Sequence, residues 1–323
     1  MSTIAVDAMG GDSAPEEVVK GAILAKKEGV DVILSGDEKL IKSYLGNEKI
    51  PVINYPQVIS MDDDPAKAIR SNKDSSIIGA LNLVKEKKAD AVFSAGSTGA
   101  TLIGAISVLG KIKGVTRPTI ASVLPGKEKE VILVDSGANL EVKPKVLYQF
   151  AIMGSKLSEL LFDIENPRIG LINNGEESSK GRELEKATFK LLKSSQLNFI
   201  GNVEGKDFAN SKVDVFVTDG FTGNVVLKTL QGVAKLQQDL ISKSLKENLF
   251  KPLLVPVKNA ISPVKSMLNP NSTNGSYLLG VNGLVIIGHG SSNSEAIKNA
   301  LLFTSRAVEK RFINKFTEVS SEL

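Results

Sequence analysis

Near its start the chain reads Ile4-Ala-Val-Asp-Ala-Met-Gly-Gly-Asp-Ser-Ala-Pro-Glu16, an apolar run that passes through two adjacent glycines toward acidic residues. The first four residues have the β-branched character of a short buried strand. Ser13 and Glu16 form a capping-box pattern and Pro15 suits a first helical turn, so we expect a helix directly after the glycines. A strand that leads through a tight turn into a helix is the basic unit of α/β proteins.

The same unit recurs along the chain. Six further apolar runs end in, or lead into, Gly, Asp, Asn, Ser or Thr, and stretches with helical spacing lie between them; the runs are Val32–Ser35, Ala91–Ser94, Ile132–Asp135, Ile169–Asn173, Val213–Thr218 and Leu284–Ile287. Together they predict an α/β/α sandwich around a mostly parallel sheet. Ile120–Leu124 and Val131–Val134 flank a polar turn, which indicates a hairpin, so we expect the sheet to be mixed.

One domain is expected over residues 1–323, with a departure from the sheet near residues 225–275. The pattern there is helical and is interrupted by four prolines. Because proline ends or kinks a helix, we expect a helical excursion in several pieces.

Composition excludes several classes of protein. Hydrophobic residues make up 42% of the 323 residues, and the absence of cysteine excludes disulfides, thiolate nucleophiles and cysteine-type zinc sites. No run of about 18 apolar residues occurs, which argues against a membrane-spanning helix. A net charge of +4 and 5% aromatic content argue against nucleic acid as a partner. With no signal-peptide pattern at the N-terminus, these features predict a cytoplasmic protein.

The loops after the predicted strands are rich in Gly, Ser, Thr and Asn. Ligands of open α/β sheets bind outside the carboxyl ends of strands, and glycine-rich turns at helix N-termini suit phosphate because they present backbone amides. We therefore expect a phosphate-type anion site, with Asp7 and Asp12 as organisers of amides because carboxylates would repel the anion. The candidate residues are Asp7, Gly10, Gly11, Asp12, Ser94, Gly96, Ser97, Thr98, Gly99, Asn139, Asn173 and Asp219.

Other chemistries have little support in the sequence. The Walker A and dinucleotide-binding fingerprints and the Gly-x-Ser-x-Gly nucleophile elbow are all missing. His289, the single histidine, lies between two glycines after a predicted strand and is a candidate proton carrier or oxyanion donor. Three consecutive acids before Pro65 are typical of a helix start, so we assign no metal, and we expect no cofactor.

Several motifs in order along the chain carry a family resemblance. They are Asp7-Ala-Met-Gly-Gly-Asp12, Lys73-Asp-Ser-Ser76, Ser94-Ala-Gly-Ser-Thr-Gly99, Asp219-Gly-Phe-Thr-Gly-Asn224 and Gly280-Val-Asn-Gly283, followed by Ile287-Gly-His-Gly290. In these motifs the sequence resembles the bacterial phosphate acyltransferase family, PlsX, over about residues 3–312.

The resemblance implies a reaction, partners and a place in the cell. A fatty acyl chain passes from an acyl carrier protein thioester to inorganic phosphate, giving acyl phosphate for phosphatidic acid synthesis. The resemblance also implies a homodimer with a fold similar to the isocitrate and isopropylmalate dehydrogenases. It further implies peripheral attachment to the anionic inner membrane surface and contact with the downstream glycerol-3-phosphate acyltransferase.

The implied chemistry needs no enzyme nucleophile, because phosphate itself attacks and a thiolate leaves. By resemblance, Lys180, Asn224 and His289 form the polar centre: Lys180 neutralises phosphate, and the other two orient it or donate to the oxyanion. A solvated surface lysine paired with its acidic neighbours is the alternative for Lys180.

Residues 249–268 mix apolar residues with three lysines at seven-residue spacing. Short basic-amphipathic pieces of this kind can lie on an anionic membrane, and we expect Leu253, Leu254, Val255, Val257 and Lys258 to contact it. Packing in a dimer interface is the alternative for this segment. For the whole chain, the alternatives are a dehydrogenase or short-acyl phosphotransferase on a related fold, and a membrane-surface scaffold without activity.

Overall fold

The structure is a computed structural model that describes residues 2–210, 212–247, 275–321 and 323. Its centre is an eleven-stranded sheet in the order β3-β2-β1-β4-β11-β10-β5-β6-β9-β7-β8. The strands are β1 (Thr3–Asp7), β2 (Asp31–Gly36), β3 (Val52–Asn54), β4 (Ala91–Ser94), β5 (Thr119–Leu124), β6 (Val131–Val134), β7 (Ile169–Ile172), β8 (Phe199–Val203), β9 (Val215–Val217), β10 (Ser276–Leu279) and β11 (Leu284–Ile287).

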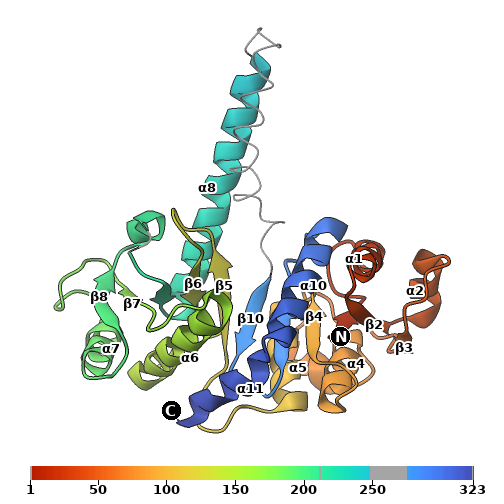
Figure 1. Ribbon diagram of the computed structural model, residues 1–323, viewed down its shortest axis with the longest axis horizontal. Coiled ribbons are helices and arrows are strands. Elements are labelled where there is room, and N and C mark those ends of the chain that lie inside the picture. Colours follow the sequence, from red (N-terminus) through yellow and green to blue (C-terminus); the bar gives the residue numbers. More distant parts are fainter. Residues whose placement is uncertain (1, 211, 248–274, 322) are drawn as a thin grey trace.

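Helices cover both faces of this sheet (Figure 1). They are α1 (Glu16–Lys27), α2 (Glu38–Leu45), α3 (Pro65–Ser71), α4 (Ser76–Lys85), α5 (Thr98–Leu109), α6 (Pro144–Phe162), α7 (Glu183–Lys193), α8 (Gly220–Glu247), α10 (Ser294–Glu309) and α11 (Phe312–Phe316), with 3-10 turns η1 (Gly205–Asn210) and η4 (Thr317–Ser321). Among the described residues, none of these helices combines the length and apolar character needed to cross a bilayer.

The sheet has two halves that run in opposite directions. Strands β3, β2, β1, β4 and β11 are mutually parallel, and so are β6, β9, β7 and β8. Between the halves, β10 pairs antiparallel with both β11 and β5, and β5 pairs antiparallel with β6. Because three antiparallel pairs separate β11 from β6, the carboxyl ends of the two halves point toward opposite edges of the sheet.

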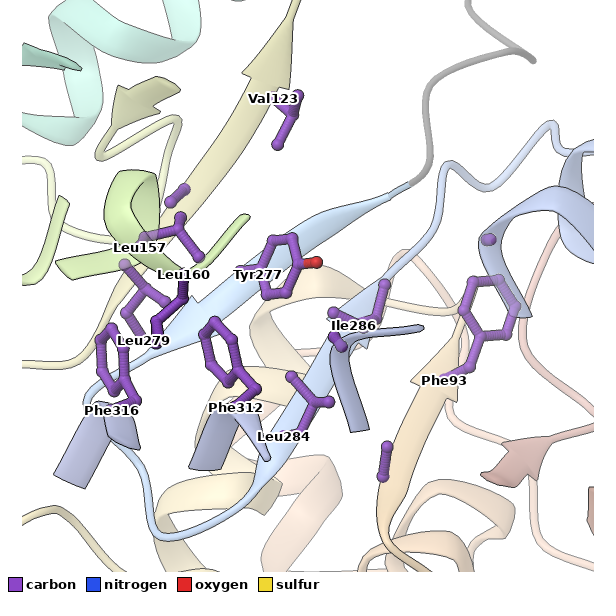
Figure 2. Close-up of a cluster of buried hydrophobic side chains, with 14 of the residues drawn as sticks. Phe93, Val123, Leu157, Leu160, Tyr277, Leu279, Leu284, Ile286, Phe312 and Phe316 are labelled. Carbon is purple, nitrogen blue, oxygen red and sulfur yellow. The ribbon is translucent and has the colours of Figure 1, made fainter. Parts of the chain in front are cut away.

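The two faces of the sheet are covered differently. On one face a single large core unites α1, α10, α6 and α11 along the sheet. Figure 2 shows part of it, where Tyr277 of β10 lies beside Phe312 of α11 at a ring-centroid distance of 5.4 Å. On the other face there are two separate cores, one under α4 and α5 and one that packs against the first turns of α8. The gap between those two cores lies over β5 and β10, in the centre of the sheet.

Most of the expected architecture is confirmed. All seven runs expected as strands are strands of one mixed, mostly parallel sheet, and Ile120–Leu124 pairs antiparallel with Val131–Val134. The hairpin is only part of the antiparallel centre, because β10 is a strand that the sequence did not indicate. Asp64 caps α3 by accepting from the amide of Lys67, as expected for the acids before Pro65.

Two local expectations need correction. The capping box at Ser13 is absent, because α1 begins only at Glu16 and Pro15 occupies its N-cap position without a side-chain cap. The helical excursion begins at Gly220 rather than near residue 225, and α8 extends away from the body of the molecule (Figure 1). The expected membrane contacts at Leu253, Leu254, Val255, Val257 and Lys258 lie outside the described residues.

Candidate functional site

A cavity of about 270 Å³ lies in the central gap between the two cores. Its floor is built from β5 and the start of β10, where the hydroxyl of Ser122 is 2.8 Å from those of both Ser136 and Ser276. Thr98, the first residue of α5, lines the cavity, and so do Asn224 and Leu227 on the side of α8. The cavity therefore meets the N-terminus of α5, whose partial positive charge favours an anion.

His289 lines the cavity from the loop after β11. The amide of Ser291 donates to its Nδ1 over 3.3 Å, and the Ser291 hydroxyl lies 2.9 Å from the same atom. Burial and the nearby Lys228 lower the pKa of His289, whereas Asp12 opposes them. In the neutral imidazole, with Nδ1 accepting from the amide, Nε2 carries the proton and can donate it.

Aliphatic side chains also line the cavity. They are Ile120 and Leu124 of β5, Leu227 of α8 and Ile287 at the end of β11. A cavity lined by both hydrogen-bond donors and aliphatic side chains suits a molecule with a charged head and a hydrocarbon tail.

The first loop lies behind this cavity and holds its neighbours in place. Asp7 is buried. Its carboxylate accepts hydrogen bonds from the amide of Met9 over 3.3 Å and from the hydroxyl of Ser94 over 2.7 Å. Burial raises the pKa of the Asp7 carboxyl, although these bonds oppose the rise. A Cβ on Gly10 would be 2.7 Å from the amide nitrogen of Gly96, so only glycine allows the two loops to approach this closely.

The remaining candidates of these loops contribute mainly structure. Ser97 caps α5 by accepting from the amide of Ala100, and the missing side chain of Gly99 leaves room for Pro65. The amide of Asp12 donates to the carbonyl of Gly290 over 2.8 Å, which ties the first loop to the His289 loop. Gly11, at a φ of +119°, provides the turn that this requires.

In the second half of the sheet a buried carboxylate organises the loop after β6. Asp135 accepts from the amides of Gly137, Ala138 and Asn139, and from the side-chain amide of Asn139, over 2.6–3.1 Å. The carbonyl of Asn139 accepts from the amide of Gly220, so the loop is joined to the start of α8. Asn139 is itself buried and holds this turn together.

Lys180 lies at a different place from Asn224 and His289. Within the described part of the chain it does not line the central cavity, and its amide donates to the carbonyl of Glu177. Asn173 lines a separate, open cavity of about 540 Å³ at the ends of β7 and β9. Nearby, Asp219 is 1% exposed, accepts from the amide of Thr222 and is ion-paired with Arg182.

The structure thus brings together Thr98, Asn224 and His289 but separates Lys180, Asn173 and Asp219 from them. The segments after β4, β6, β9 and β11 contribute lining residues to this cavity, whereas the loop after β7, which carries Asn173 and Lys180, does not. The sequence reasoning also missed Ser136 and Lys228, which line the cavity. Lys228 lies one helical turn after Asn224, and that i, i+4 spacing was a readable signal.

Among the described residues no group of three or more metal-ligating side chains is close enough to hold a metal ion.

Comparison with known proteins gives consistent relatives. A family model described as fatty acid synthesis protein matches residues 2–315. A phosphate acyltransferase from Halothermothrix orenii is 43% identical over 320 residues, which cover 96% of each chain. A phosphate acyltransferase from Pelotomaculum thermopropionicum is 45% identical over 319 residues, which cover 96% of this chain and 92% of that one.

Solved structures resemble this chain in fold. A phosphotransacetylase from Streptococcus pyogenes superposes with a TM-score of 0.60 at 18% identity, covering 95% of this chain and 94% of the other. A 4-hydroxythreonine-4-phosphate dehydrogenase from Klebsiella pneumoniae superposes with a TM-score of 0.55 at 13% identity, covering 94% and 98%. These likenesses confirm the expected dehydrogenase-like α/β/α fold. From the family model and the relatives above 40% identity, the chain belongs to the phosphate acyltransferase family, PlsX, whose members transfer acyl groups in a reaction that involves phosphate.

Proposed function

We propose that this protein transfers a fatty acyl group from acyl-[acyl-carrier-protein] to inorganic phosphate, giving acyl phosphate for phospholipid synthesis. The observation that supports this proposal is the central cavity, which combines the N-terminus of α5, Asn224 and His289 with aliphatic side chains. Phosphate suits these polar groups. The first carbons of an acyl chain suit Ile120, Leu124 and Leu227, since burying each methylene contributes about 0.8 kcal/mol.

In the proposed reaction a phosphate oxygen attacks the thioester carbonyl carbon. The new C–O bond forms, the C–S bond breaks, and the carrier's thiolate leaves with the electron pair and takes up a proton. Asn224 and the Nε2–H of His289 orient phosphate or donate to the developing oxyanion, which is where fixed donors lower the barrier most. No acyl-enzyme intermediate forms, because phosphate is the nucleophile and the cavity only positions it beside the thioester.

Thiol release from an acyl carrier thioester tests the proposal directly. Purified protein should release carrier thiol only when phosphate is present, and acyl phosphate should accumulate in equal amount. Asn224→Ala should lower kcat/KM by about 100-fold, the effect typical of losing one oxyanion donor. Gln237→Ala, an exposed change on the same helix, is the control and should leave the rate unchanged. Thiol release that is independent of phosphate would exclude this reaction.

A short-acyl phosphotransferase is the second candidate, and the same assay separates it. Acetyl-CoA in place of the carrier thioester should give little turnover if the aliphatic side chains of the cavity bind a long chain. Higher kcat/KM with acetyl-CoA than with a long-chain carrier thioester would favour the second candidate.

The proposal includes a homodimer that attaches peripherally to the cytoplasmic face of the membrane and meets the downstream glycerol-3-phosphate acyltransferase there. Among the described side chains of α8, six large apolar ones are exposed, namely Phe221, Val225, Leu230, Val233, Leu236 and Leu240. An apolar surface of this kind on a projecting helix suits a second copy of the chain. Light scattering of Leu236→Glu should then report a monomer, and liposome flotation tests attachment separately.

A further inference from the structure

We propose that Lys228 is the cation that binds inorganic phosphate in the central cavity, a role that the family resemblance gave to Lys180. The inference rests on the proposed function, because it names the residue that holds the nucleophile of that reaction.

Lys228 lies at the cavity beside the other polar residues of the site. It lines the cavity together with Asn224 and His289, and it lies four residues after Asn224 on α8. Residues at this spacing project from the same side of a helix, one turn apart. Asn224 and Lys228 therefore face the cavity from successive turns of α8.

Lys228 is the one lysine among the lining residues in the described ranges. No carboxylate is among its lining residues in the described ranges, and Lys228 forms no ion pair with any residue that the structure describes. Phosphate at neutral pH carries between one and two negative charges, so the N-terminus of α5 alone, with about half a charge, leaves most of its charge uncompensated. A lysine that binds as a point charge, with three rotatable donors, supplies the rest.

Lys180 has a different environment. It lies in the loop after β7, where its carbonyl accepts from the side chain of Asn173 and its aliphatic stem packs against Gly175. In the sheet order, β7 is five strands away from β11, which carries His289. Lys180 therefore lies apart from the cavity that His289 lines.

Lys228 also acts on His289, which gives a second readout. Besides the hydrogen bonds with Ser291, three effects set the pKa of the His289 imidazole. Burial lowers it, Lys228 on α8 lowers it further, and Asp12 in the first loop raises it. Removal of the lysine charge should raise the pKa of His289. Because the neutral imidazole is the active form, the acid limb of the activity profile should then move to higher pH.

The experiment compares Lys228→Met with Lys228→Arg, Lys180→Met and Lys235→Met in the full-length protein. Lys235 is exposed on α8, two turns beyond Lys228 and outside the cavity lining, so Lys235→Met is the matched control. Lys228→Met should raise KM for phosphate at least tenfold, with KM for the carrier thioester changed less than twofold. Lys228→Arg should restore most of the phosphate affinity, and the acid limb should shift only in Lys228→Met.

Two outcomes would overturn the inference. One is an unchanged KM for phosphate in Lys228→Met; the other is a tenfold rise in Lys180→Met that Lys228→Met does not show. Calorimetric titration with inorganic phosphate measures binding without turnover, so it reports on Lys228 even in a variant with low activity. Wild-type protein that binds phosphate but never transfers an acyl group would instead refute the proposed function and leave the assignment of the phosphate-binding lysine standing.

Discussion

Replacement of Asp135 by Asn tests which of two opposing effects dominates in a buried carboxylate. The side chain is fully buried, which disfavours its ionised form, and it accepts four hydrogen bonds, which favour that form. Burial dominates and raises the pKa of Asp135 from 3.8 to about 6. Since one pKa unit corresponds to about 1.4 kcal/mol, ionisation in the folded protein costs about 3 kcal/mol more than in the unfolded chain.

The sign of the pH dependence follows from linkage. The folded protein holds the Asp135 proton more tightly, so the contribution to the free energy of unfolding is fully present below about pH 4 and is lost as pH rises through about 6. Asn cannot ionise, so Asp135→Asn should lack this loss. The substitution should also lower the free energy of unfolding by about 1–3 kcal/mol at low pH, because the NH₂ group of the new Asn faces the donors of Asn139.

Urea unfolding of both proteins between pH 4 and 8 measures the difference directly. The stability advantage of the wild type over Asp135→Asn should shrink by about 3 kcal/mol across pH 4 to 7. Asp31→Asn, a change of an exposed carboxylate on β2, is the control and should show no such trend. An advantage that grows with pH would mean that the hydrogen bonds outweigh burial, and the reasoning would be refuted.

Further substitutions test packing and buried polar groups, and the shift of the urea unfolding midpoint measures the effect of each. Gly223→Ala should destabilise by about 3 kcal/mol, because its Cβ would be 1.9 Å from the carbonyl oxygen after β6. Gly232→Ala, with no atom within 4 Å, should instead stabilise α8 by up to about 1 kcal/mol. Tyr277→Phe should be neutral or stabilising, because the buried hydroxyl has no partner among the described residues (Figure 2); a loss above about 1 kcal/mol would contradict this. Arg182→Ala should cost about 3 kcal/mol by leaving Asp219 buried and unpaired, and no loss would show that solvent replaces the guanidinium.

Strand-to-helix units could be read from the sequence because buried parallel strands are continuous apolar runs with a turn residue at their end. The strand Ser276–Leu279 was not predicted, because no helix follows β10 directly. It is held by antiparallel pairing with β5, which is distant in sequence, and with β11, which follows it. The relative direction of the two halves is set by these antiparallel pairings. For that reason the sequence could not show that the loop of Lys180 lies apart from His289.

The candidate site was predictable only in part. Family motifs named Asn224 and His289, and the structure places both at one cavity. The spacing of Lys228 from Asn224 was the one signal for this lysine, and its relation to His289 exists only after β11 and α8 meet over the centre of the sheet. Asp135 was visible as a strand-end residue, but its buried hydrogen bonds depend on the turn geometry of residues 135–139.

The pairing of β11 with β4 bears on how the chain acquires its shape during synthesis. The half that contains the N-terminus is incomplete without residues 284–309, because β11 fills its sheet and α10 packs on α1. The other half, β6 to β9, draws its strands from residues 131–217 and can form while the ribosome is still translating. We therefore expect the middle of the nascent chain to gain protease resistance first, and its beginning to remain sensitive until the last helices emerge.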